Sequence, residues 1–482
     1  MRGNDRKPEL LAPAGNADAL RAAVRWGADA VYFGLKNSFN ARAKADNFGM
    51  GELPETIAFA RQNGVKVYAA FNTLIRQSEL ERAAGEALAA YRAGADALIV
   101  QDLGLAAELL RREPGVVLHA STQAGIHNAE GALYAKERGF RRVILSRETP
   151  IAEIRRIKET VGIEAEVFVH GALCVSFSGA CYFSSVATGN SGNRGRCLQL
   201  CRKRYSAQCT VHSPQLKDNA ECFGHFSLSK PVKDCPSKEN SRLQAEKSVG
   251  ELLSGNNSQL PDDKEPDNTS QFSIFNSQLS GTSQLKNGYL LSPADLCLLN
   301  ELDALREAGV DCVKIEGRMR RPEYVAETVR SYRRALDGIP DPDALGRLKT
   351  VYNRGDYTTG YLYGVQMNFI SIDIQGHKGL YAGDILRVNG PFLEVKRAPD
   401  RSSCGGAGRG KGNRLGNRGG ERGGGRGFEN GDAFKILRGG AEIGSAKCEN
   451  GRIVYSGKPR PGDKLHITTS ARLNRELNIE KR

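Results

Sequence analysis

The stretch ELLAPAGNADALRAAVRWGADAVYFGL, residues 9–35, contains one complete strand–helix–strand unit. Apolar runs at residues 9–15 and 30–35 suit strands that are buried on both faces, and residues 16–27 between them have helical periodicity. Gly27, followed by Ala-Asp-Ala, is typical of a helix that ends at a glycine before the chain turns into the next strand. The stretch therefore predicts a parallel β-α-β unit.

The same alternation of apolar strand and amphipathic helix recurs along the chain. Further strands are expected at residues 65–73, 97–102, 116–123, 142–147, 165–171 and 312–318. Helices are expected at residues 54–63, 79–93, 151–161 and 321–338. Eight strands in this pattern predict an α/β fold, a TIM-like (β/α)8 barrel, rather than an open doubly wound sheet, which usually has fewer strands.

Polar and charged residues gather where the predicted strands end. In a parallel barrel the carboxyl ends of all strands meet at one rim, which is where barrel enzymes carry out catalysis. Each residue alone is an ordinary turn or surface residue, but their coincidence at eight strand ends indicates a functional site. The residues are Asn16, Asn40, Arg42, Asn72, Gln101, Asp102, Ser121, Thr122, Gln123, Arg147, Glu166, His170, Glu316 and Arg318.

Four cysteines follow the seventh predicted strand, in a stretch rich in Gly, Ser and Asn. Cys174, Cys181, Cys197 and Cys201 have the spacing C-x6-C-x15-C-x3-C. Because they leave a strand at the expected rim, we expect the thiols beside the pocket. Four soft ligands suit an iron–sulfur cluster or a structural zinc ion, and the wide, unequal gaps resemble cluster ligation more than zinc knuckles. Disulfides or free thiols are the alternative.

Composition narrows the class of protein. The chain has 482 residues, of which 40% are hydrophobic and 11 are cysteines, and its formal net charge is +14. This length fits roughly two or three domains. Neither a secretory signal nor a bilayer-spanning apolar run is visible, so we expect a cytoplasmic protein without a membrane partner, whose cysteines bind metal. The excess of basic over acidic residues favours a polyanionic partner, and RNA is the partner that we expect.

Shifts in composition divide the chain into segments. The barrel is expected over residues 1–205 and 288–340, interrupted at 206–287 by a low-complexity insertion that is rich in Ser, Asn, Gln and Lys. Within the second part of the barrel, residues 288–309 are expected to supply a helix before the eighth strand. Cys297 would lie on the apolar side of that helix.

The C-terminal segment, residues 341–482, has the period-two pattern of a small antiparallel β-barrel. An Arg/Gly tract at 405–427 interrupts it. Such a tract can present guanidinium groups to phosphates and bases, or it can be a solvated loop. Strands are expected at residues 368–375, 383–390, 392–397, 433–439 and 463–470.

Several of these motifs resemble the collagenase-like peptidase family, peptidase family U32. The resemblance rests on the opening stretch, on EVFVHGALCVSFSGACYFS and GNRGRCLQLCRKRY around the cysteines, and on LSPADLC and VKIEGRMRRPEYV. It covers about residues 8–205 and 288–338, with a β-rich tail similar to the extension of some members. Members are similar in holding a 4Fe-4S cluster, which the resemblance assigns to Cys174, Cys181, Cys197 and Cys201.

The resemblance also implies an activity, because better-understood relatives hydroxylate bases of tRNA or rRNA and others assist hydroxylation of a quinone precursor. We therefore expect an iron–sulfur-dependent RNA base hydroxylase. Carboxylate and imidazole groups would handle protons near the cluster, while guanidinium and amide groups would orient the RNA or a small carboxylate co-substrate. The candidate catalytic residues are Glu166, His170, Asn72, Arg147, Glu316 and Arg318.

Two other hypotheses stay open alongside the hydroxylase. One is a collagenase-like peptidase, although the chain contains neither an H-E-x-x-H nor a G-x-S-x-G motif. The other is a non-catalytic RNA-binding or assembly protein whose metal site, with zinc as the less favoured metal, is structural. The sequence leaves the electron donor and the oligomeric state open.

Overall fold

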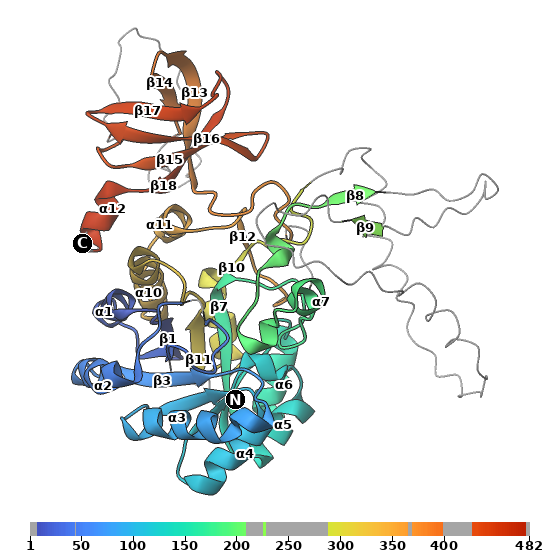
Figure 1. Cartoon of the computed structure of the whole chain (residues 1–482). Coiled ribbons are helices and arrows are strands. Elements are labelled where there is room, and N and C mark those ends of the chain that lie inside the picture. The colour runs from blue at the N-terminus through green and yellow to red at the C-terminus, as the bar shows by residue number, and fades with distance from the viewer. Residues whose placement is uncertain are drawn as a thin grey trace, which may run out of the picture. The chain divides into compact units, whose positions relative to one another are not determined.

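The structure is a computed structural model, and Figure 1 shows the course of the chain. It describes residues 7–43, 45–208, 225–227, 288–364, 369–398 and 427–478. Its two main parts are both closed sheets, one parallel and one antiparallel.

The parallel sheet is an eight-stranded barrel, as predicted. Each strand pairs in parallel with the next, and the last strand closes the ring because it pairs with both the seventh and the first. Cys312, for example, lies opposite Glu9 on one side and Glu166 on the other. The strands are β1 (Glu9–Pro13), β2 (Ala30–Gly34), β3 (Lys66–Phe71), β4 (Ala97–Val100), β5 (Leu118–Ala120), β6 (Phe140–Ile144), β7 (Glu164–Ala172) and β11 (Cys312–Ile315).

Helices cover the outside of this barrel, and several begin at a side-chain cap. Asn16 accepts a hydrogen bond from the backbone N–H of Ala19, and Asp102 does the same for Leu105, which satisfies amide groups that have no partner within the helix. Gly27 ends the first helix with a φ of 91°, as the Gly-Ala-Asp-Ala pattern predicts. The helices are α1 (Ala17–Arg25), α2 (Leu53–Gln62), α3 (Leu80–Arg92), α4 (Leu103–Arg112), α5 (Ala129–Glu137), α6 (Ile151–Thr160), α9 (Leu302–Glu307) and α10 (Pro322–Leu336).

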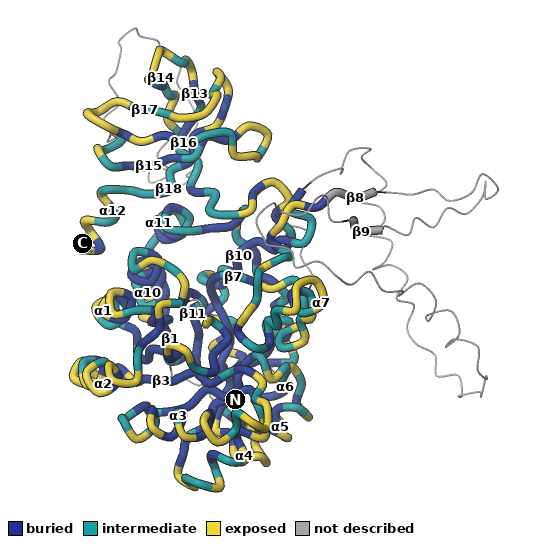
Figure 2. The backbone as a smooth tube through the Cα atoms, in the orientation of Figure 1, coloured by how far each residue is buried: buried dark blue, intermediate teal, exposed yellow. Residues whose placement is uncertain are grey.

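The barrel strands are buried on both faces, which explains their nearly continuous apolar sequences. Leu10, Leu11, Phe33 and Phe71 have no exposed surface. Figure 2 shows the strands in the buried colour and the outer faces of the helices in the exposed colour. Burial of each such side chain contributes about 1.5–3 kcal/mol to folding.

One prediction about the barrel is wrong, because residues 295–297 form a strand and not part of a helix. β10 (Asp295–Cys297) runs antiparallel to the last residues of β7, with Cys297 opposite His170. Pro293, just before it, lacks an N–H and disfavours a helix. β7 extends beyond the residues that pair with β11, and β10 pairs with this extension. The expected helix is reduced to α9.

The second closed sheet is the predicted small antiparallel barrel, in the order β13-β14-β17-β16-β15-β18. Its core contains Ile385, Phe434, Ile436 and Leu465. Its strands are β13 (Leu380–Asn389), β14 (Phe392–Arg397), β15 (Ala433–Arg438), β16 (Ala441–Glu449), β17 (Arg452–Gly457) and β18 (Lys464–Thr469). Other elements of the C-terminal segment are α11 (Ala344–Val351), β12 (Tyr357–Thr358) and α12 (Ala471–Glu476).

Two strand predictions in this segment differ from the structure. The strand expected at 368–375 is not formed at 369–375, where Ile370 makes only an isolated bridge with Pro293. The hairpin of β16 and β17 was not predicted, although Asn450-Gly451 between them is a strong hairpin signal. Both residues have positive φ, 49° and 74°, as the tightest two-residue turns require.

The segment Arg204–Gly288 is a unit separate from the rest of the chain. Within it, β8 (Ser206–Gln208) pairs antiparallel with β9 (His225–Ser227). The rest of the expected insertion at 206–287, and the Arg/Gly tract except Gly427, lie outside the described residues. No helix in the described part of the chain is long and apolar enough to cross a membrane.

Candidate functional site

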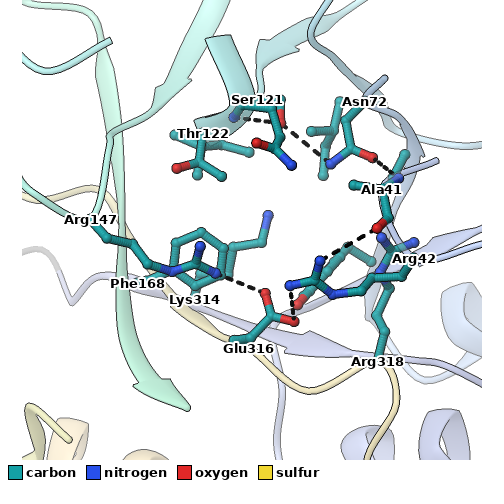
Figure 3. Close-up of a pocket in the computed structure, with 15 residues that line it drawn as sticks. Ala41, Arg42, Asn72, Ser121, Thr122, Arg147, Phe168, Lys314, Glu316 and Arg318 are labelled. Carbon is teal, nitrogen blue, oxygen red and sulfur yellow. Dashed lines mark hydrogen bonds and ion pairs between the residues drawn. The ribbon is translucent and has the colours of Figure 1, made fainter. Parts of the chain in front are cut away.

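A pocket opens at the carboxyl ends of the barrel strands, and the side chains that line it converge from most of the strands (Figure 3). Four of the lining side chains are cations and one is a carboxylate. Asn72, Arg147, Glu316 and Arg318, four of the six candidate catalytic residues, line this pocket together. The cations are Arg42, Arg147, Lys314 and Arg318, and the carboxylate is Glu316.

Glu316 lies between two arginines at the floor of the pocket, as Figure 3 shows. Its Oε2 atom is 2.9 Å from Nη2 of Arg147, and its Oε1 atom is 3.4 Å from Nη2 of Arg42. Burial alone would raise the pKa of Glu316, but the nearby guanidinium groups outweigh burial and hold the pKa at about 2. Glu316 is therefore ionised at neutral pH and orients both arginines.

Arg318 is the cation of the pocket that lacks a carboxylate partner among the described residues. It is buried and donates from Nη1 to Oδ1 of Asn40 at 3.2 Å. Burial lowers its pKa to about 10, so it is still protonated at neutral pH. A buried guanidinium paired only with an amide oxygen is a ready donor for an anionic ligand.

Asn72 connects two loops of the rim. Its Oδ1 atom accepts from the backbone N–H of Ala41 at 3.0 Å, and its Nδ2 atom lies 3.4 Å from Oγ of Ser121. Because the loops that follow β2 and β5 carry lining residues, this amide fixes the width of the pocket (Figure 3).

Glu166 does not lie at the rim, where the sequence pattern predicts it. It is the third residue of β7 rather than a residue of the strand's end, and its side chain is fully buried in the barrel interior. There its carboxylate binds Nζ of Lys314 at 2.8 Å and Nη1 of Arg142 at 3.2 Å. Glu166 does not line the pocket. It binds Lys314, which does line the pocket, from within the barrel interior.

His170 is also away from the pocket. Its ring packs among Tyr324, Tyr332 and Tyr357, and burial lowers its pKa to about 3. The pairing of β7 with β11 shifts register at this point, and a shift of this kind re-aims the side chains that follow it. His170 is therefore neutral at physiological pH and does not face the pocket, which Phe168 lines.

The four expected ligands lie on one loop, residues 173–203, which we call the cysteine loop. It is fastened to the rim at several points. Arg194 forms two hydrogen bonds of 2.7 Å with Glu79, and Oγ of Ser178 accepts from the backbone N–H of Arg147 at 3.3 Å. At Gly195, which has a φ of 76°, a Cβ atom would stand 2.3 Å from the carbonyl oxygen of Asn40. Only glycine permits this close approach.

The loop that carries the four thiols borders the pocket. Ser178 accepts from the backbone N–H of Arg147, and Gly179 lies against the carbonyl of Gln123; both partners line the pocket. Burial raises the pKa of the Cys201 thiol to about 11, and the neighbouring cysteines add to this effect.

The donor set of the loop fits an iron–sulfur cluster. None of the cysteines in the described residues forms a disulfide, and the loop contains no Asp, Glu or His that could compete as a ligand. Four thiolates suit an iron–sulfur cluster, and a zinc ion takes the same ligands. Within the described ranges, no three Cys, His, Asp or Glu side chains are gathered as a finished metal site.

Sequence reasoning missed Lys314, Tyr32 and Phe168, which also line the pocket. The signal for Lys314 was present in VKIEGR, where Lys314, Glu316 and Arg318 occupy alternate positions of an otherwise apolar segment. Alternate residues of a strand face the same side of the sheet, so the spacing predicts that all three side chains point into the barrel.

Comparison of the sequence with known protein families shows where the chain belongs. The model of the family described as "Peptidase family U32" matches residues 15–368. The chain belongs to peptidase family U32.

Relatives of this U32 member carry two kinds of name. The "tRNA hydroxylation protein P1" of Bacillus subtilis (strain 168) is 33% identical over 70% of this chain and 65% of its own length. The 23S rRNA 5-hydroxycytidine synthase of Escherichia coli (strain K12) is 33% identical over 80% of this chain and 50% of its own length. A "Collagenase" of Porphyromonas gingivalis is 32% identical over 74% of each chain. The chain thus spans between half and three quarters of these relatives.

Proposed function

We propose that this U32 protein hydroxylates a base of tRNA or rRNA, with a 4Fe-4S cluster bound by Cys174, Cys181, Cys197 and Cys201. The observation that carries the proposal is that the loop with the four cysteines is fastened to a cationic pocket at the barrel rim, through the contacts of Ser178 with Arg147 and of Gly179 with Gln123. The names of the B. subtilis and E. coli relatives support RNA as the substrate. The formal net charge of +14 suits a polyanionic partner.

Hydroxylation replaces a C–H bond of the base with C–OH; with water as the source of the oxygen, two electrons and two protons leave and pass to an external acceptor. Protein side chains do not carry out such electron transfer, which a 4Fe-4S cluster held by the four cysteines would supply. The residues of the pocket have the complementary task of binding and orienting. Arg318 and Arg147 offer guanidinium forks to an anion, and Lys314 adds a point charge at the centre of the pocket (Figure 3).

The anion in this pocket is, in our proposal, either a phosphate of the RNA or the carboxylate of a small co-substrate. The floor is preorganised for it, because Glu316 fixes two of the arginines and Glu166 fixes Lys314. Preorganised charges need not reorient when the ligand arrives, which favours tight and specific binding. We assign no proton transfer to His170, whose ring is buried among tyrosines.

The peptidase alternative has the name of the P. gingivalis relative in its favour. A cysteine peptidase needs a base within hydrogen-bond reach of its thiol. In the described residues His170 makes its contacts with tyrosines, and no hydrogen bond joins it to Cys174. The geometry therefore supports the hydroxylase better.

Two measurements test the proposal. Protein purified without oxygen should be brown, with broad visible absorbance and close to four irons and four sulfides per chain, as a 4Fe-4S cluster requires. Digested tRNA and rRNA from cells that lack the gene should lose one nucleoside that is one oxygen atom heavier than its parent. An unchanged nucleoside profile in both RNA classes would overturn the RNA assignment.

A further inference from the structure

The cysteine loop carries an exposed aromatic surface that ligand binding by the thiols does not explain. The three most exposed large apolar side chains in the described part of the chain are Val186 at 86%, Phe177 at 70% and Tyr182 at 65%, and all three lie on this loop. Large apolar side chains are kept in contact with water at a binding surface more often than elsewhere. Val186 belongs to α7 (Phe183–Thr188), whose outer turn is coloured as exposed in Figure 2.

The backbone that carries Phe177 is anchored beside the pocket by the two residues that follow it. Phe177 precedes Ser178, whose hydroxyl accepts from the backbone N–H of the pocket residue Arg147. Gly179 follows, at a φ of 78°, so close to the carbonyl of Gln123 that a Cβ atom would lie 2.0 Å from it. Tyr182 is next to Cys181. The backbone beside Phe177 is thus fixed at the pocket. In the described ranges neither Phe177 nor Tyr182 packs against another aromatic ring or a cation.

The charge of the cysteine loop indicates the kind of partner. Residues 173–203 contain four basic side chains and no Asp or Glu. Arg194 is paired with Glu79 and Arg202 is buried, but Arg196 and Lys203 are exposed and form no ion pair with any residue that the structure describes. Exposed aromatic rings and uncompensated cations on one loop are the combination that binds single-stranded nucleic acid, because bases stack on the rings while cations contact phosphates.

We propose that Phe177 and Tyr182 form a stacking surface for unpaired bases of the RNA, with Arg196 and Lys203 on its phosphates. The inference rests on the proposed function and adds how the substrate is held. A base stacked on Phe177 lies next to the pocket. Because only an unpaired base offers its face to a ring, the surface selects unpaired loops over duplex RNA. A protein partner would need the apolar area but not the aromatic faces, and this difference can be tested.

Leucine substitution separates the two, because leucine keeps the apolar area and removes the ring. We expect Phe177→Leu and Tyr182→Leu each to weaken binding of a fluorescent single-stranded oligouridylate by about tenfold in an anisotropy titration. Binding of a duplex RNA of the same length should change little. Tyr134→Leu, at an aromatic residue on α5 that is 45% exposed, is the matched control and should bind like the parent.

A direct readout of stacking comes from Phe177→Trp, because the parent chain has only one tryptophan, Trp26. Oligouridylate should quench the added fluorescence well beyond the change seen in the parent. Unchanged RNA affinity in both leucine variants, or no extra quenching, would overturn the stacking surface. Self-association of the parent protein would also overturn it if Phe177→Ser abolished that association, because the exposed aromatic surface would then join two copies of the chain. A normal nucleoside profile in cells lacking the gene would instead overturn the proposed function, whatever the stacking assay shows.

Discussion

At the scale of single residues, the charge state of the pocket depends on one carboxylate among several cations. Glu316 binds Arg147 and Arg42, and these cations keep its pKa at about 2, against an ordinary value of 4.5. A carboxyl group whose pKa is lower in the folded state stabilises the fold above its unfolded pKa. That contribution is lost as the pH falls through the folded pKa.

We therefore predict that Glu316→Gln flattens the acid dependence of stability. In the parent protein this group should contribute on the order of 3 kcal/mol to the free energy of unfolding above about pH 5, and this contribution is lost progressively as the pH falls towards and below the folded pKa of about 2. The variant should be less stable than the parent at neutral pH and approach it in acid. Urea unfolding at a series of pH values measures this. Glu394→Gln, at an exposed residue of β14, is the control, and an equal acid slope in Glu316→Gln and the parent would contradict the account.

At the scale of elements, the cysteine loop joins the barrel rim to the ligand set. Its anchors, from Arg194 to Glu79 and from Ser178 to Arg147, are independent of any metal. The loop must keep its shape for the thiols to act as one ligand set, whereas the fold of the barrel does not depend on the thiols. Loss of a ligand should therefore empty the site without unfolding the chain.

Single replacement of Cys197 or Cys201 by Ser should remove most of the iron and sulfide from anaerobically purified protein. Cys297→Ser should leave the iron content unchanged, because Cys297 lies on β10 beside the Tyr332 hydroxyl and outside the cysteine loop. Metal analysis together with visible absorbance measures both outcomes. Full iron occupancy in Cys201→Ser would contradict the ligand assignment.

The elements also show how far sequence reasoning reaches. Repeated apolar strands and the glycine-ended first helix are local signals, and they predicted the barrel and the rim positions of Arg147, Glu316 and Arg318. β10 and the burial of His170 depend on which strand edge is left free and on a register shift between β7 and β11. Such features arise from tertiary pairing and leave no periodic trace in the sequence. The hairpin at Asn450-Gly451 did leave a trace, in its turn residues.

At the scale of the whole molecule, the barrel is encoded by two stretches of chain separated by residues 206–287. The ends of this insertion meet, because Tyr205 and Gly288 exchange two backbone hydrogen bonds of 2.7 and 2.9 Å. Ends that are already paired can be joined by a short turn with little cost in closure entropy. The two parts of the barrel therefore do not depend on the insertion for their connection.

Replacement of residues 206–287 by a two-residue Asn-Gly turn, a length taken from tight hairpins, should leave the barrel folded. We expect a cooperative thermal transition within a few degrees of the parent and the same iron content, measured by circular dichroism and metal analysis. A turn of the same length placed inside α10 is the disruptive control. Aggregation or loss of iron in the insertion variant would show that the insertion packs on the barrel.

The central claim is that the thiols of the cysteine loop and the cations of the pocket act as one RNA-hydroxylating site. The most direct measurement is nucleoside mass spectrometry of tRNA and rRNA from cells lacking the gene, complemented in turn with the parent, Cys201→Ser, Arg318→Gln and Cys297→Ser. The account predicts that the parent and Cys297→Ser restore one hydroxylated nucleoside, and that Cys201→Ser and Arg318→Gln do not. Restoration by Cys201→Ser or Arg318→Gln at the parental level would contradict it.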